Sequence, residues 1–174
     1  MTSTDRIRSA IRDVPDFPKP GIVFKDITPV LGDGALFRAT TDLFVEQLAG
    51  LGVTRVAGID ARGFIFAGAV ADRLGIGFIP IRKKGKLPFK THRASYQLEY
   101  GESTLELHED AVHPGEKIAL IDDVLATGGT AAAAIKLLQD CQAQVVSVQF
   151  FIELGFLHGR KNLPPVPISS IVIY

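Results

Sequence analysis

The spacing of hydrophobic residues along the chain predicts an alternation of buried strands and amphipathic helices. Apolar runs with the length of buried strands stand at 55–59, 78–81, 117–121, 145–152 and, near the end, 170–173. Between them, apolar residues recur at helical spacing over 63–74 and 129–140. Strands that alternate with helices at these distances are typical of a parallel sheet flanked by helices, so the sequence predicts an α/β fold.

The first fifty residues are less regular. Thr4-Asp5 offers a side-chain cap for a short N-terminal helix. Prolines then break the pattern, and the segment 15–29 is expected to be irregular. An apolar stripe that starts after Asp33-Gly34 predicts a longer helix, which Gly50 should end.

The pattern changes again in the middle of the chain, where polar and apolar residues alternate with a period of two. The alternation covers 95–100, is interrupted by a turn at Gly101, and resumes over 104–107. This arrangement predicts an antiparallel hairpin inserted into the α/β pattern.

Composition limits the kinds of protein that this chain can be. Its 174 residues suit one domain, and 19 Lys and Arg against 19 Asp and Glu give a formal net charge of zero. Zero net charge argues against nucleic acid or a membrane surface as the main partner. The single cysteine, Cys141, excludes an internal disulfide framework and a cysteine-based zinc site. No signal peptide or membrane span is apparent, so we expect a cytoplasmic protein.

The most informative segment follows the strand predicted at 117–121. Two carboxylates, Asp122 and Asp123, are expected where this strand ends, and a turn rich in glycine and threonine, 126–130, leads into the next helix. The glycines let backbone N–H groups approach an anion, the threonines add hydroxyl donors, and the helix N-terminus favours negative charge. The carboxylates suit sugar hydroxyls instead. The segment therefore predicts a site for a ribose 5-phosphate; the alternative is a solvated strand end followed by an ordinary helix cap.

The stretch 118–130 resembles the phosphoribosyl-diphosphate (PRPP) binding motif of the type I phosphoribosyltransferases. Further segments narrow the resemblance to the adenine phosphoribosyltransferases: Phe17 to Pro29, Asp60 to Phe64, Ile81 to Pro88, Tyr96 to Gly101, and Gly159-Arg160. The resemblance runs in order through nearly the whole chain. It implies a type I phosphoribosyltransferase fold, with a central, mostly parallel, twisted sheet flanked by helices. It also implies a single domain over 1–174, with a flexible hairpin lid at about 82–110 and a small N-terminal hood for base recognition at about 1–34.

The resemblance also implies an activity. Such an enzyme transfers the 5-phosphoribosyl group from PRPP to adenine in purine salvage, giving AMP and diphosphate. Mg²⁺ is expected to be held through PRPP, without direct protein ligands, and the chain is expected to form a homodimer. One alternative is an enzyme for another purine base: guanine, hypoxanthine or xanthine. A regulator that senses PRPP and binds DNA is disfavoured, because only a short stretch precedes the first family segment and the net charge is zero.

Site residues follow from the same resemblance. The ribose and 5′-phosphate are assigned to Asp122, Asp123, Ala126, Thr127, Gly128, Gly129 and Thr130. The diphosphate is assigned to Asp60, Ala61, Arg62, Arg82 and Lys86, with a cis peptide expected between Asp60 and Ala61. Adenine is assigned to Val23, Phe24, Lys25 and Leu154. Ala61 stands where serine is common and Lys25 where arginine is common, so neither the hydroxyl nor the guanidinium contact is expected.

Charge and chemistry in the hairpin region fit a lid. Residues 82–93 carry six Lys and Arg and no acid, whereas 94–110 carry five acids and no Lys or Arg. The resemblance implies that the basic part of the lid approaches diphosphate, with Arg82 expected to do so from a neighbouring subunit. The resemblance also implies that Glu99 is the catalytic residue, which handles the proton of the base, and that Tyr100 packs on the ligand. The alternatives are a solvated hairpin with Glu99 facing outward and, for 60–63, a plain helix start with a surface arginine.

Overall fold

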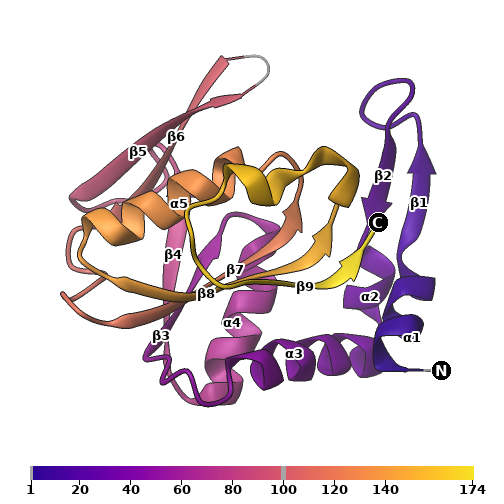
Figure 1. Cartoon of the computed structure of the whole chain (residues 1–174), viewed down its shortest axis with the longest axis horizontal. Coiled ribbons are helices and arrows are strands. Elements are labelled where there is room, and N and C mark those ends of the chain that lie inside the picture. Colours follow the sequence, from indigo (N-terminus) through magenta and orange to yellow (C-terminus); the bar gives the residue numbers. More distant parts are fainter. Residues whose placement is uncertain (1, 99–100) are drawn as a thin grey trace. The chain divides into compact units, whose positions relative to one another are not determined.

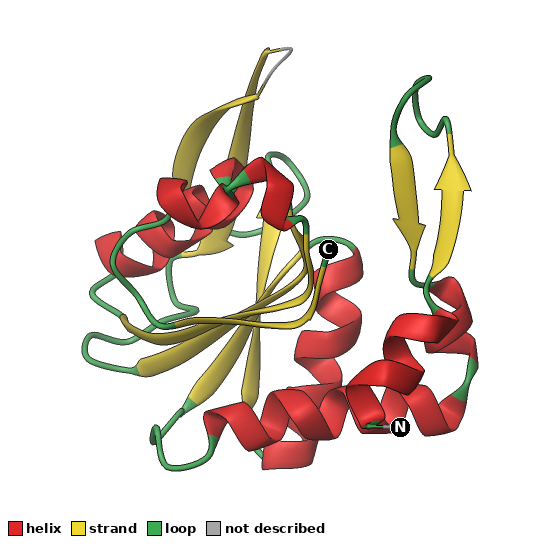
Figure 2. Ribbon diagram, turned by 45° about the vertical axis from the view of Figure 1, so that its right-hand side comes forward, coloured by secondary structure: helices red, strands yellow, loops and turns green. Residues whose placement is uncertain are grey.

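The computed structural model describes residues 2–98 and 101–174. The chain forms two compact units, 1–43 and 44–174, whose elements are labelled in Figure 1 and coloured by type in Figure 2. The first unit contains α1 (Ser3–Ala10), β1 (Arg12–Pro15), β2 (Val23–Asp26), α2 (Thr28–Gly32) and the start of α3 (Gly34–Leu48). Among residues 2–98 and 101–174, no helix is both long and apolar enough to cross a membrane.

Two predictions for the first unit are wrong. The cap of α1 is Thr2, whose hydroxyl accepts the Asp5 N–H while the Asp5 carboxylate accepts the Thr2 N–H, so the cap lies two residues before the predicted Thr4. The segment 15–29 is not irregular throughout, because β1 and β2 pair as an antiparallel hairpin and α2 follows. Four-residue strands are too short to show a clear period, and Pro15 is tolerated because it lies at the end of an edge strand.

The second unit is built on one seven-stranded sheet with the order β5-β6-β4-β3-β7-β8-β9. Its strands are β3 (Arg55–Ile59), β4 (Gly77–Lys83), β5 (Thr91–Leu98), β6 (Gly101–His108), β7 (Lys117–Leu125), β8 (Gln144–Glu153) and β9 (Ile168–Ile173). Neighbours among β4, β3, β7, β8 and β9 are parallel, whereas β6 and β5 are antiparallel. The predicted central, mostly parallel sheet with an antiparallel hairpin is therefore confirmed.

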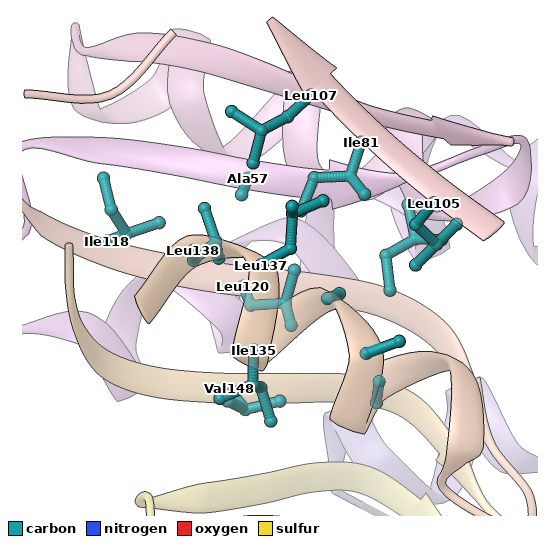
Figure 3. Close-up of a cluster of buried hydrophobic side chains, with 14 of the residues drawn as sticks. Ala57, Ile81, Leu105, Leu107, Ile118, Leu120, Ile135, Leu137, Leu138 and Val148 are labelled. Carbon is teal, nitrogen blue, oxygen red and sulfur yellow. The ribbon is translucent and has the colours of Figure 1, made fainter. Parts of the chain in front are cut away.

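Helices cover both faces of this sheet (Figure 1). On one face, α5 (Gly129–Asp140) packs its leucine and alanine side chains onto the inner strands, where Figure 3 shows Leu137 and Leu138 beside Leu120 and Ile81. On the other face, α4 (Arg62–Leu74) contributes Phe66, whose ring centre lies 4.9 Å from that of Phe151. Each face buries apolar surface, which supplies the main driving force for folding.

Strand boundaries differ from the prediction at two places that matter for the site. β7 continues through Leu125, so Asp122 and Asp123 lie inside the strand, and the prediction that they stand at its exit is wrong. β7 extends this far because β8 pairs with it up to Glu153. Gly101 begins β6 and pairs with Leu98, so the predicted antiparallel hairpin is confirmed and Gly101 is the first residue of its second strand.

Candidate active site

Strands β3 and β4 bring an acidic and a basic residue to the same edge of the sheet. Ile59 pairs with Ile81, so the next residues, Asp60 and Arg82, stand side by side where β3 ends. Arg82 Nε lies 3.4 Å from Asp60 Oδ2, and its guanidinium carbon lies 6.0 Å from the centre of the Phe64 ring. The Arg82 guanidinium and the Phe64 ring thus lie at the carboxyl ends of the parallel strands, where open α/β sheets bind ligands.

The acidic pair of β7 lies beside the start of α4. Asp122 and Asp123 are both buried, and the Asp123 N–H donates to Asp122 Oδ1 at 2.9 Å. The Arg62 guanidinium forms an ion pair with the Asp123 carboxylate. The structure thus brings together Arg62, which the sequence assigns to diphosphate, and the carboxylates that it assigns to ribose.

Close packing explains why glycine stands at position 63. A Cβ atom on Gly63 would lie 2.6 Å from Asp122 Oδ1, so any side chain here would displace the carboxylate. Burial, together with the neighbouring Asp123 charge, raises the pKa of Asp122 well above its ordinary value of 3.8. A carboxyl group accepts from hydroxyl groups when ionised and can also donate to them when protonated, so Asp122 suits recognition of a sugar in either form.

The loop between β7 and α5 is shaped for close approach of backbone groups. Gly128 adopts φ +90° and precedes α5, whose first turn closes through the Ala132 N–H and the Gly128 carbonyl at 2.8 Å. A Cβ on Gly128 would lie 2.4 Å from the Gly159 carbonyl oxygen, and one on Gly159 would lie 2.2 Å from the Ala126 carbonyl oxygen. The loop 126–130 and the segment around Gly159 therefore support each other through backbone contact.

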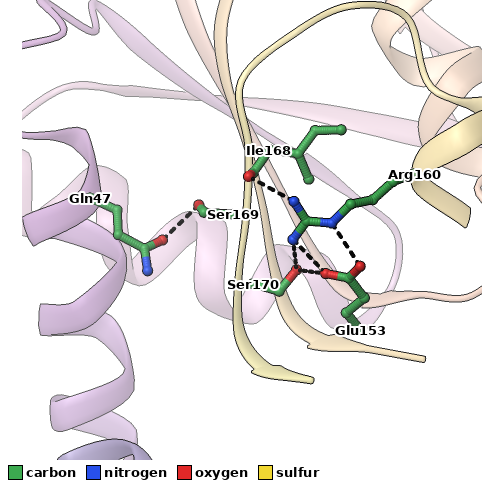
Figure 4. Close-up of polar contacts among 6 residues, drawn as sticks. All are labelled: Gln47, Glu153, Arg160, Ile168, Ser169 and Ser170. Carbon is green, nitrogen blue, oxygen red and sulfur yellow. Dashed lines mark hydrogen bonds and ion pairs between the residues drawn. The ribbon is translucent and has the colours of Figure 1, made fainter. Parts of the chain in front are cut away.

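Side chains fix the segment that follows β8 (Figure 4). Arg160 donates from Nε to Glu153 Oε1 at 2.7 Å and from Nη2 to Glu153 Oε2 at 2.6 Å, and the Ser170 hydroxyl donates to the same carboxylate. These hydrogen bonds hold the pKa of Glu153 below its usual range. Asn162 adds a hydrogen bond of 2.8 Å from Nδ2 to the Thr127 carbonyl. The bidentate pair thus anchors the segment against which the loop 126–130 rests.

The hairpin of β5 and β6 reaches the same loop. The Thr130 hydroxyl at the start of α5 lies 3.3 Å from the hydroxyl of Tyr96, which is on β5. The 5′-phosphate loop assigned from the sequence and the strand that leads to Glu99 are therefore joined by a direct contact.

The residues assigned to adenine from the first unit lie on β2. The Phe24 ring packs edge-on against Phe17, with 5.2 Å between ring centres. Lys25 Nζ donates to Asp13 Oδ1 at 2.7 Å across the hairpin, and Val23 is half exposed. Leu154 is in the second unit, where its N–H donates to the Leu125 carbonyl at 2.9 Å.

Comparison with known proteins identifies the family. Residues 37–163 match the phosphoribosyl transferase domain. A protein of Neorhizobium galegae named adenine phosphoribosyltransferase is 55% identical over 93% of this chain and 90% of its own length. The chain belongs to the adenine phosphoribosyltransferase family. The resemblance stated from the sequence motifs is therefore confirmed.

Solved structures of adenine phosphoribosyltransferases share the fold. The structure from Rhodothermus marinus superimposes with a TM-score of 0.94 at 49% identity, covering 99% of this chain and 98% of that one. The Saccharomyces cerevisiae structure, in complex with an imino-altritol bisphosphate and adenine, gives 0.93 at 35% identity, covering 97% and 98%. The predicted type I phosphoribosyltransferase fold is confirmed by these likenesses.

For this adenine phosphoribosyltransferase family member, the structure brings many of the predicted residues to one edge of the second unit. Asp60, Arg62, Arg82, Asp122 and Asp123 are linked by ion pairs or by the strand register. The expected cis peptide between Asp60 and Ala61 is present. Glu99 and Tyr100, the catalytic and packing residues of the prediction, lie outside the described residues.

Sequence reasoning missed the residues that support the loop 126–130. Gly159, Arg160 and Tyr96 served only as parts of family segments, and Glu153 and Asn162 were not assigned at all. Glu153 had a detectable signal, because a charged residue ends a long apolar strand. Among residues 2–98 and 101–174, no group of three His, Cys, Asp or Glu side chains is placed to hold a metal ion.

Proposed function

We propose that this chain transfers the 5-phosphoribosyl group of PRPP to adenine and releases AMP and diphosphate. The observation that carries the proposal is the run of residues 122–130, in which buried carboxyl groups and a glycine-rich helix start follow one another. Few ligands other than a ribose 5-phosphate need hydroxyl acceptors and a phosphate cradle so close together. Membership of the family supplies the reaction.

The ribose 5-phosphate would be held by this run. Asp122 and Asp123 would bind the ribose hydroxyls, and the loop Ala126, Thr127, Gly128, Gly129 and Thr130 would bind the 5′-phosphate. The αL conformation of Gly128 and the N-terminus of α5 turn backbone N–H groups toward an anion. The support from Gly159 keeps the loop in place before the ligand arrives.

The diphosphate would lie beside Asp60, Ala61, Arg62, Arg82 and Lys86. Two guanidinium groups suit a polyanion because they present several donors in a fixed plane. Mg²⁺ would be held through PRPP rather than by direct protein ligands, since this ion keeps several waters and binds substrate phosphate oxygens instead of a protein cage. When bound through PRPP, the ion would neutralise charge on the diphosphate leaving group.

Adenine would be read by Val23, Phe24, Lys25 and Leu154. The Lys25 ammonium is engaged by Asp13, so recognition would use the backbone groups of Val23 and Lys25 and the ring of Phe24. The related Saccharomyces cerevisiae enzyme has been solved with adenine bound, which supports a purine with a 6-amino group as the acceptor.

Glu99 would move the proton of the base as its nitrogen displaces diphosphate from the anomeric carbon, and Tyr100 would pack on the ligand. The two residues before them in the chain, Gln97 and Leu98, belong to β5, the strand that contacts Thr130 through Tyr96. We expect Glu99→Gln to lower kcat much more than the affinity for PRPP. Equal losses in both would contradict the proton-transfer role.

The setting of the reaction is also part of the proposal. We propose a cytoplasmic homodimer that acts in purine salvage on small-molecule substrates, without nucleic acid or membrane as partner. The formal net charge of zero supports the exclusion of nucleic acid.

One assay tests the function directly. The protein is incubated with PRPP, Mg²⁺ and one purine base at a time, and nucleotide formation is followed by chromatography. Adenine should give AMP with the highest kcat/KM, and guanine, hypoxanthine and xanthine should react far more slowly. Failure to form AMP, together with activity on another base, would overturn the choice of adenine.

A further inference from the structure

Glu106 is a buried acidic residue among the basic residues of the lid region. It lies on β6 and is 1% exposed. The strand register pairs it with Arg82 of β4 on one side and with Arg93 of β5 on the other. In the sequence it belongs to the acidic run 94–110, but the structure places it inside the basic group.

The Glu106 carboxylate is ion-paired through one oxygen and hydrogen-bonded through the other. Arg93 Nε lies 2.8 Å from Oε1, and the backbone N–H of Gly85 donates to Oε2 at 2.9 Å. A buried carboxylate is stable only when it is paired and hydrogen-bonded. Arg93 and Gly85 are therefore both tied to the position of this one side chain.

Gly85 lies in the turn that connects Arg82 to Lys86. Gly85 adopts φ +81°, and the turn is closed by the Lys86 N–H on the Lys83 carbonyl at 3.3 Å. Arg82 Nη1 donates to the Lys86 carbonyl at 3.1 Å. The turn thus fixes the Arg82 guanidinium relative to the backbone of Lys86, and Glu106 fixes the turn to the sheet.

We propose that Glu106 is a positioning residue for the diphosphate-binding cations Arg82 and Lys86. This inference rests on the proposed function, in which these two residues bind the diphosphate of PRPP. Glu106 itself does not touch the ligand. It holds the turn through the Gly85 N–H, so that the cations face the leaving group without a reorganisation penalty when PRPP binds.

The sign of the effect distinguishes positioning from simple electrostatics. The negative charge of Glu106, acting only through space, would oppose diphosphate binding. Removing that charge would then strengthen binding. If Glu106 acts by holding the turn, its removal weakens binding instead, because the cations lose their fixed geometry.

The chain contains a matched control at the amino ends of the parallel strands, just before β7 begins. Glu116 precedes β7, accepts the His113 N–H on Oε2 at 2.8 Å and pairs through Oε1 with Arg55 Nε at 3.0 Å. Gly115 beside it has φ +82°. Glu106→Gln can therefore be compared with Glu116→Gln, and Gly85→Ala with Gly115→Ala. A Cβ on either glycine would meet no atom within 4 Å, so both alanine variants strain only their own turn.

The experiment measures binding of inorganic diphosphate with Mg²⁺ by calorimetry, and kcat and both KM values in the adenine assay. Glu106→Gln should weaken diphosphate binding by up to about tenfold, because the amide can still accept the Gly85 N–H but lacks the charge that strengthens this bond and pairs with Arg93. KM for PRPP should rise similarly, while kcat and the KM for adenine change by less than about twofold. Gly85→Ala should act in the same direction, and the two control variants should leave binding unchanged.

Other results would overturn the role of Glu106 or the proposed function. Unchanged or tighter diphosphate binding by Glu106→Gln, or equal weakening by Glu116→Gln, overturns the inference. If Glu106→Gln fails to fold, Gly85→Ala decides, because it perturbs the exposed turn and leaves the buried carboxylate intact. A wild-type protein that binds diphosphate but forms no AMP refutes the proposed function only, whereas one that binds no diphosphate overturns the inference as well.

Discussion

Gly128 and Gly159 face each other where the loop 126–130 meets the segment after β8. Carbonyl oxygens of Gly159 and Ala126 occupy the space that side chains at these two positions would need. Backbone contact of this kind leaves no side chain to adjust, so the spacing between the two segments is set by the glycines themselves.

Replacing Gly159 by alanine should therefore damage both the fold and the site. The added Cβ would lie 2.2 Å from the Ala126 carbonyl oxygen, so we expect a loss of about 1–3 kcal/mol in the free energy of unfolding. KM for PRPP should rise because the loop 126–130 must move. Urea unfolding and steady-state kinetics measure the two effects.

Gly68→Ala is the control for this substitution. Gly68 lies inside α4 with no atom within 4 Å of an added Cβ, so alanine should stabilise the protein by about 0.5–1 kcal/mol. Equal behaviour of the two variants would show that the close approach at Gly159 has no energetic consequence.

Asp122 should make stability depend on pH in a specific direction. Its pKa in the folded protein is raised, chiefly by burial and then by Asp123, from an ordinary value of 3.8. The folded state then binds more protons than the unfolded state above that pH, so this carboxyl favours folding fully only below about 3.8 and loses the effect as pH rises through its folded pKa. We expect Asp122→Asn to gain stability relative to the wild type as pH rises from 4 toward neutrality.

Urea unfolding across this pH range tests the prediction. Asp110→Asn, which changes an exposed carboxyl, should follow the wild-type curve and is the control. A difference between Asp122→Asn and wild type that stays constant with pH would contradict the raised pKa. KM for PRPP should rise in Asp122→Asn, because the proposed contact with ribose is altered.

At the scale of elements, periodicity identified the regular parts of the second unit. Long apolar patterns gave α4, α5, β3, β7 and β8, because their spacing reflects burial on one or both faces. β1 and β2 were missed since four residues cannot establish a period. The end of β7 was missed because it depends on pairing with β8, and charged residues inside a strand look like a strand end when the partner is unknown.

The same limit applies to the candidate site. Asp122, Asp123 and the loop 126–130 are contiguous, so the sequence shows them together. Glu106 and Gly159 act on distant segments, and only the strand register and the chain path bring them to the site. Such supporting residues have no local pattern, which is why the predicted site contained ligand-facing residues and few of those that hold them.

Arg160 allows a test of how one element supports another. Arg160→Lys would replace a bidentate contact with Glu153 by a single point of contact, and it would lose the contact with the Ile168 carbonyl at 3.3 Å. We expect a loss of about 1–3 kcal/mol in the free energy of unfolding, and a higher KM for PRPP through the segment at Gly159. Thermal unfolding and kinetics provide the measurements.

The control is an ion pair that does not belong to the segment after β8. Lys136 and Asp140 pair on the surface of α5, so Lys136→Gln should cost less than about 0.5 kcal/mol and leave KM unchanged. If Arg160→Lys lowered stability without any change in KM for PRPP, the segment after β8 would have a structural role only.

The whole molecule combines zero net charge with strongly separated charges. Within the basic run 82–93, Arg82 pairs with Asp60 and Arg93 pairs with Glu106. Lys83, Lys84 and Lys86 are exposed. With no net charge, the protein attracts a distant polyanion only weakly. The basic run 82–93 attracts it strongly once it is within a few ångströms.

This distribution predicts that salt affects the two substrates differently. Raising monovalent salt from about 0.1 M to about 1 M shortens the screening length from about 10 Å to about 3 Å. PRPP carries several negative charges and adenine carries none at neutral pH. At constant free Mg²⁺ we expect KM for PRPP to rise by about fivefold or more over this range, and KM for adenine to change less than about twofold. Steady-state kinetics with each substrate varied in turn measures both, and a parallel rise in the two KM values would mean that salt acts on the whole fold rather than on the separated charges around the diphosphate.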